Sequence, residues 1–145
     1  MDRQAFVEKR VHTYYWEHDW NCAVTTLRIL SEVFDIAVGE QVLDAALGMH
    51  GAGEYGAQCG LVEGGLMFLG IAGKAKDLPD QVVVTACRDY AEAFEALFGS
   101  LLCRELRPEG FQPGNPDHLC ERLTCDAVRF DIRFVTDLLA DWEDG

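Results

Sequence analysis

Six cysteines carry the most distinctive chemistry in this chain. They are Cys22, Cys59, Cys87, Cys103, Cys120 and Cys125. None is separated from another by two residues, so the CxxC pairs of thioredoxins and zinc ribbons and the CxxCH sequence of haem attachment are absent. Cysteine thiolates ligate zinc and iron–sulfur clusters and exchange disulfides. The residue type therefore predicts a redox or metal site. The positions of the cysteines along the chain indicate which of them form that site.

Four cysteines share an expected place in the first turn of a helix. They are Cys22, Cys59, Cys103 and Cys120, preceded by the candidate caps Asp19 and Ser100, by the Asn115-Pro116 pair and, for Cys59, by a glycine-rich loop. A first turn offers free N–H donors and the positive end of the helix dipole, which favour a thiolate and lower the pKa of a cysteine. Convergence of four such positions would stabilise a negatively charged thiolate cluster.

The other two cysteines are expected to be structural. Cys87 falls on the apolar stripe of a long helix, where a buried thiol behaves as a small hydrophobic group. Cys125 comes five residues after Cys120, which is roughly 140° further around a helix, so these two cannot easily face one site. We expect neither to be a ligand.

The chain resembles the redox-active proteins named for the spaced signature C_GCAxxG_C_C, whose domain also occurs in split-Soret cytochromes. The matching segments are 21–23, 58–70, 98–106 and Cys120. The resemblance implies an all-α fold and a redox role for Cys22, Cys59, Cys103 and Cys120, with an iron–sulfur cluster as the suspected cofactor.

The chain departs from this signature beside one cysteine. Where the signature has Gly-Cys-Ala, the chain has Gln58, Cys59 and Gly60, and its loop carries His50 and Glu54 among the glycines. The larger residue before Cys59 is expected to narrow the site.

Three readings of the site stay open at this stage. In the first, the four cysteines ligate an iron–sulfur centre for electron transfer. In the second, a metal-free dithiol acts as an oxidoreductase or redox sensor, with a low-pKa thiolate such as Cys59 attacking and a neighbouring cysteine resolving. In the third, the chain is a structural zinc site or a helical interaction module. We place them in that order, and whether the chain is an enzyme stays open.

The elements that position these cysteines are predicted to be helices. Apolar spacing and helix-ending residues indicate a first helix at 3–18 and a second from a cap at Asp19 to about Asp35. Further helices are predicted at 40–47, 59–71, 79–98 and 100–106. The segment 117–142 is predicted to form one helix or two. Glycines make 48–56 a loop, and prolines and glycines do the same for 107–116. The prediction is one domain, 1–145, a compact bundle of about five to seven helices around a central helix. Glycines at positions 60, 64 and 65 of that helix predict a close approach by backbone or a ligand.

Composition limits the partners and the compartment. The net charge of −13 argues against nucleic acid and against an anionic membrane surface. The N-terminus has no apolar run of the signal-peptide kind, and the longest weakly charged stretch, 55–72, is interrupted by Glu63 and rich in glycine. We therefore expect a cytoplasmic protein with a redox partner protein, whose identity is unknown.

Histidines and aromatic residues near the cysteines complete the candidates. His50 and His118 could replace a cysteine as ligand or move protons, but we favour solvent-facing roles for both. Tyr14, Tyr15, Trp16 and Trp20 could shield a cofactor, although core packing or a homodimer contact is the commoner role of such a cluster.

Overall fold

The protein is all-α, as predicted. The computed structural model describes residues 2–144, which form α1 (Arg3–Trp16), α2 (Cys22–Phe34), α3 (Glu40–Ala45), α4 (Gly51–Glu54), α5 (Gly60–Ala75), α6 (Asp80–Phe98), α7 (Cys103–Leu106) and α8 (Glu121–Asp144). In this described part the only β-type pairing is an isolated bridge between Gln58 and Leu102. Met1 and Gly145, the ends of the predicted 1–145 domain, lie outside the described residues.

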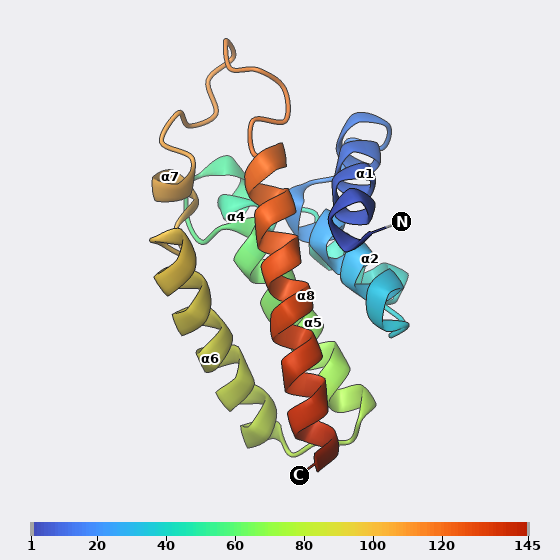
Figure 1. The fold of residues 1–145 in the computed structure, drawn as a ribbon. Coiled ribbons are helices and arrows are strands. Elements are labelled where there is room, and N and C mark those ends of the chain that lie inside the picture. The colour runs from blue at the N-terminus through green and yellow to red at the C-terminus, as the bar shows by residue number, and fades with distance from the viewer. Residues whose placement is uncertain (1, 145) are drawn as a thin grey trace.

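Helix α5 is the central element, as its nearly continuous apolar sequence predicts. It packs against α2, α6 and α8, which surround it in Figure 1. Its glycines allow this approach: a Cβ at Gly64 would lie 2.9 Å from the carbonyl oxygen of Ala23, and one at Gly65 would overlap the hydroxyl of Tyr90. The predicted close approach at these positions is therefore confirmed.

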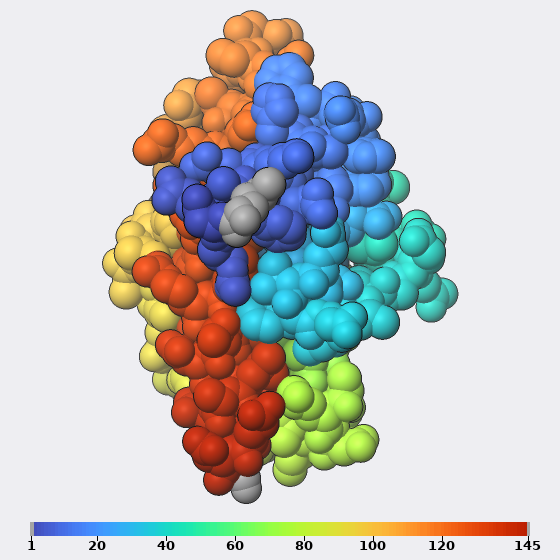
Figure 2. Space-filling view, turned by 45° about the vertical axis from the view of Figure 1, so that its right-hand side comes forward, coloured from blue at the N-terminus to red at the C-terminus, as the bar shows by residue number. Residues whose placement is uncertain are grey.

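Helix α8 is one continuous helix that runs the length of the molecule (Figure 1). Helix α1 packs across its first half, and Figure 2 shows the loop before α8 lying against the segment that follows α1. The described helices include none that is both long and apolar enough to span a membrane.

The space between α6 and α8 is filled by an aromatic core, which we define as Tyr90, Phe94, Phe98, Phe130 and Phe134. Ring centroids of neighbouring members lie 4.5 to 6.1 Å apart. The hydroxyl of Tyr90 pairs at 2.6 Å with Oδ1 of Asp131, which is fully buried. Burial raises the pKa of Asp131 well above its ordinary value, which favours the neutral form of this carboxyl in the folded protein.

Three helix starts differ from their predicted positions, and the predicted loop 48–56 contains the short helix α4. Helix α7 begins at Cys103 with Leu102 at its N-cap, so the predicted cap Ser100 lies before it. The cap of α2 is Asn21, whose Oδ1 accepts a hydrogen bond from the backbone N–H of Val24 at 2.8 Å. Asp19, the predicted cap, has a left-handed φ of 53° and belongs to the turn before it. Helix α8 begins at Glu121, because residues 117–120 form turns in which His118 also has a positive φ.

Candidate redox site

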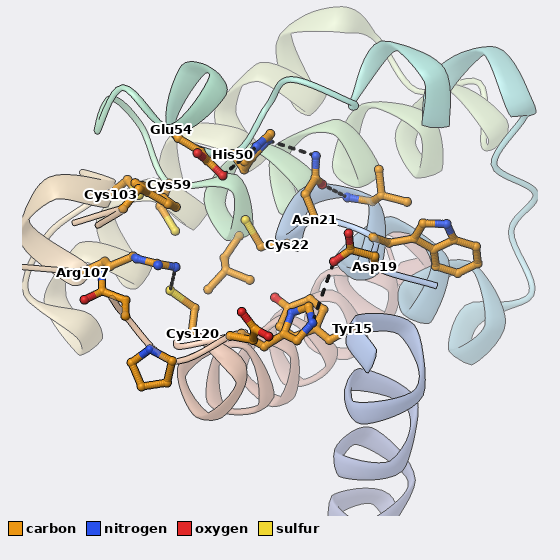
Figure 3. A pocket seen from close by; sticks show the side chains of 18 of the residues that line it. Tyr15, Asp19, Asn21, Cys22, His50, Glu54, Cys59, Cys103, Arg107 and Cys120 are labelled. Atoms are coloured by element: carbon orange, nitrogen blue, oxygen red, sulfur yellow. Dashed lines mark hydrogen bonds and ion pairs between the residues drawn. The ribbon is translucent and has the colours of Figure 1, made fainter. Parts of the chain in front are cut away.

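One cavity of about 760 Å³ brings together four of the six cysteines. Cys22, Cys59, Cys103 and Cys120 all line it, and their side chains point toward its interior in Figure 3. Each stands at or next to the start of a different helix, namely α2, α5, α7 and α8. The predicted first-turn placement is thus confirmed for Cys22 and Cys103 and is wrong for Cys59 and Cys120, which directly precede α5 and α8.

Cys22 is the first residue of α2, and its neighbour Asn21 connects it to the glycine-rich loop. The Nδ2 of Asn21 donates to the carbonyl of Leu47 at 2.8 Å and lies 3.1 Å from Nδ1 of His50. Because Oδ1 of the same amide caps α2, this one side chain fixes the loop relative to the helix that carries Cys22.

Cys59 and Cys103 are held side by side by backbone pairing between two segments far apart in sequence. The N–H of Cys59 donates to the carbonyl of Leu101 at 2.8 Å, and the N–H of Cys103 donates to the carbonyl of Ala57 at 2.7 Å. Gly51 faces Cys103 so closely that a Cβ there would lie 3.0 Å from its sulfur. The glycine in this loop therefore makes room for a cysteine side chain.

Cys120 lies at the end of the 107–120 loop and is contacted by Arg107. The Nη1 of Arg107 approaches Cys120 Sγ at 3.6 Å, while Nε donates to the carbonyl of Gly110 at 2.7 Å. The guanidinium also stacks on the ring of Phe111, 4.0 Å from its centroid. Arg107 was not among the site residues predicted from the sequence. Its position one helical turn after Cys103 could have indicated that it lies near that cysteine.

The pKa values of three of these thiols are raised, which corrects the expectation of low-pKa thiolates. Burial is the largest cause for Cys22, Cys59 and Cys103, and the other cysteines of the cavity add to it. For Cys59 the result is a pKa of about 11, even though the backbone N–H groups of Leu61 and Val62 act to lower it. The helix-start effect is present at Cys59, but loss of water outweighs it.

Cys87 and Cys125 lie outside the cavity, as predicted. Cys87 is half-buried on α6, where its thiol contacts the carbonyl of Leu66 at 4.0 Å. Cys125 is buried on α8, and burial raises its pKa to about 11; the charged groups that act on it are Arg129, Glu121 and other side chains, not cysteines.

An aromatic side chain forms part of the wall between the cysteines and the surface. Tyr15 is 4% exposed, lines the cavity and donates or accepts a 2.6 Å hydrogen bond with the hydroxyl of Thr124. Its ring stacks on His118 with centroids 5.3 Å apart, and Trp16 packs edge-on against the same histidine. Tyr15 and Trp20 thus line the cavity, whereas Tyr14 and Trp16 do not.

Both candidate histidines line the cavity, so the expectation that they face solvent is wrong. The side chain of His118 is 18% exposed, and its Nε2 lies 3.8 Å from Oδ1 of Asp19. The side chain of His50 is 26% exposed; Asn21 holds its Nδ1, and its Nε2 lies 4.0 Å from Oε1 of Glu54.

The cavity offers a donor set of four cysteines. Such a set can ligate a zinc ion, with all four sulfurs bound to one atom, or an iron–sulfur cluster, whose bridging sulfides separate the ligands more widely. Residues 2–144 in this conformation contain no three His, Cys, Asp or Glu side chains grouped to hold a metal ion.

The departures from the signature have a structural explanation at α5. In the stretch GCAxxG this chain has Gln58, Gly60 and Glu63 in place of the first glycine, the alanine and the last glycine. The side chains of Gln58 and Glu63 hydrogen-bond to each other, and neither lines the cavity, so the predicted narrowing by Gln58 is wrong. A Cβ at Gly60 would overlap Cys22 Sγ, which therefore occupies space that the alanine would fill.

Comparison with known proteins agrees with this arrangement. The model of the family described as "Putative redox-active protein (C_GCAxxG_C_C)" matches residues 20–131, a range that contains all four cavity cysteines. No curated protein and no solved structure matches the chain. The chain belongs to the C_GCAxxG_C_C protein family.

Proposed function

We propose that Cys22, Cys59, Cys103 and Cys120 ligate an iron–sulfur centre and that the protein transfers electrons. The observation that carries this proposal is the convergence of four cysteines, from four separate helix starts, on one cavity that excludes the other two. When bound, such a centre supplies reversible uptake of an electron.

The residues around the cavity supply what a negatively charged centre needs. The N–H groups of Leu61 and Val62 act on the Cys59 sulfur in favour of its charged form. Tyr15, Val24 and Leu61 wall the cavity, and all three are at most 6% exposed, so they form a buried wall of the cavity that the sulfurs share. A thiol with a raised pKa must lose its proton when it becomes a ligand, so binding releases protons and strengthens as pH rises.

Thiol–disulfide exchange without a metal is the weaker candidate. That chemistry needs a thiolate at neutral pH, and the pKa of Cys59 is about 11 because burial outweighs its backbone donors. A cofactor that binds the sulfurs as thiolates provides the driving force for deprotonation that the metal-free site lacks.

Charge and cysteine state suggest the setting of this reaction. The chain carries a net charge of −13, which favours an electron partner with a positively charged docking surface. All six cysteines are free thiols, the state expected in the reducing cytoplasm.

Anaerobic purification with a visible spectrum and iron, zinc and sulfide analysis tests the proposal. We expect brown protein containing iron and sulfide, and loss of both in Cys59→Ser. Cys87→Ser is the matched control, because that thiol is half-buried on α6 and lies outside the cavity.

Colourless protein after attempted cluster reconstitution would refute the proposal. Equal iron and sulfide in Cys59→Ser and wild type would also refute it, because the site would then lie elsewhere.

A further inference from the structure

Arg107 is the one Lys or Arg among the side chains that line the cysteine cavity in the described structure. The other charged lining residues are the acids Asp19, Glu54 and Asp117. A positive charge at this place is unusual in a chain with 25 acidic residues and 12 Lys and Arg. Its position relative to the sulfurs is therefore informative.

The guanidinium of Arg107 is held in place by its surroundings. Its Nε donates to the carbonyl of Gly110 at 2.7 Å, and the plane lies over Phe111. Asn115 donates to the same carbonyl at 2.8 Å and so braces the loop. A side chain held by a hydrogen bond and by a ring loses little additional conformational entropy when its charge stays at a fixed point.

That fixed point lies beside two cysteines. Nη1 of Arg107 is 3.6 Å from Cys120 Sγ, and the backbone N–H of Arg107 donates to the carbonyl of Cys103 at 2.8 Å. Figure 3 shows the guanidinium extending from α7 toward Cys120. The charge therefore acts on the Cys103 and Cys120 side of the site.

We propose that Arg107 is a positioning residue that offsets the negative charge of the Cys103 and Cys120 sulfurs and thereby raises the reduction potential of the site. This inference rests on the proposed function. Reduction adds one electron, from a one-electron donor protein or from dithionite in the assay, and leaves the site one unit more negative. A nearby positive charge stabilises that state more than the oxidised one.

Arg104 provides a matched control three residues away. Its Nε also donates to a loop carbonyl, that of Gly56 at 2.8 Å, and its guanidinium lies near the ring of Tyr55. Arg104 does not line the cavity. Arg104 lies in α7 and Arg107 directly follows it. The two arginines share a charge and a type of loop contact, and only Arg107 lines the cavity.

The first arm of the test is a spectroelectrochemical titration of cluster-loaded wild type, Arg107→Gln, Arg107→Lys and Arg104→Gln. At a fixed potential we expect the ratio of reduced to oxidised protein to fall about tenfold in Arg107→Gln. This fall corresponds to a reduction potential about 59 mV lower for a one-electron couple. Arg107→Lys keeps the charge and should recover most of the ratio, and Arg104→Gln should stay within about twofold of wild type. Equal ratios in Arg107→Gln and Arg104→Gln would overturn the proposal.

The second arm uses reduced, metal-free protein and does not depend on a cluster. Iodoacetamide labelling at neutral pH, followed by peptide mapping, should be several-fold slower at Cys103 and Cys120 in Arg107→Gln than in Arg104→Gln. If no cluster binds but this slowing is seen, the proposed function fails while the effect of Arg107 on the sulfurs stands. Unchanged labelling at both cysteines would overturn the claimed action of Arg107.

Discussion

The cysteine cavity and the aromatic core are built by different rules. The aromatic core consists of side chains at helical spacing on two long helices, α6 and α8, and its members touch ring to ring. The cavity is made from helix starts and loops, and Asp19, Ala52, Glu54 and His118 around it all have positive φ values. The aromatic core thus depends on regular helix packing. The cysteine cavity holds its side chains on irregular backbone, as is common at functional sites.

The largest expected effect comes from overfilling the contact between α5 and the aromatic core. Gly65→Ala would place a methyl group on the hydroxyl of Tyr90, which is fully buried and tied to Asp131. We expect a loss of about 1–3 kcal/mol in the free energy of unfolding, measured by urea denaturation.

Gly70→Ala is the matched control on the same helix. Nothing lies within 4 Å of a Cβ at Gly70, so the change should gain up to about 1 kcal/mol from helix propensity. Equal effects of the two substitutions on the free energy of unfolding would show that the contact with Tyr90 does not restrict the size of residue 65.

A second prediction concerns the pH dependence of the core. The pKa of Asp131 is raised in the folded state, so its contribution to stability is complete below the unfolded pKa of about 3.9 and is lost as pH rises toward the folded pKa. Asp131→Asn removes that loss. The stability of Asp131→Asn relative to wild type should therefore increase as pH rises above about 3.9.

Urea denaturation at several pH values measures this slope. Tyr90→Phe serves as the comparison, because it removes the hydroxyl that pairs with Asp131 and leaves the carboxyl in place. A stability difference between Asp131→Asn and wild type that is constant with pH would contradict the buried neutral carboxyl.

The smallest predicted effect is on the cavity side. Ala52 has φ 55° and ψ 61°, a left-handed conformation that costs an L-residue roughly 1–2 kcal/mol and that glycine adopts freely. Ala52→Gly should therefore stabilise the protein by about 1 kcal/mol. The same substitution at Ala91, inside α6, should destabilise the protein by a similar amount. Urea denaturation of both variants measures the two changes, and changes of the same sign would contradict the prediction.

The same contrast explains how far the sequence could lead. Apolar spacing, Pro79 and Gly99 predicted α6 to within a residue, because helix periodicity and end signals are local. The sequence also indicated which four cysteines gather. It missed the cap at Asn21, a local contact with Val24, because Asp19 is a second residue of capping type two positions earlier. It missed the role of Arg107, because that role depends on contacts with Gly110 and Cys120 that only the folded chain brings together.

Iron and sulfide content across all six single Cys→Ser variants tests the central claim most directly. The account predicts a division: loss of iron and sulfide in the variants of Cys22, Cys59, Cys103 and Cys120, and wild-type content in those of Cys87 and Cys125. Retention in all of the first four, or loss that ignores this division, would contradict it.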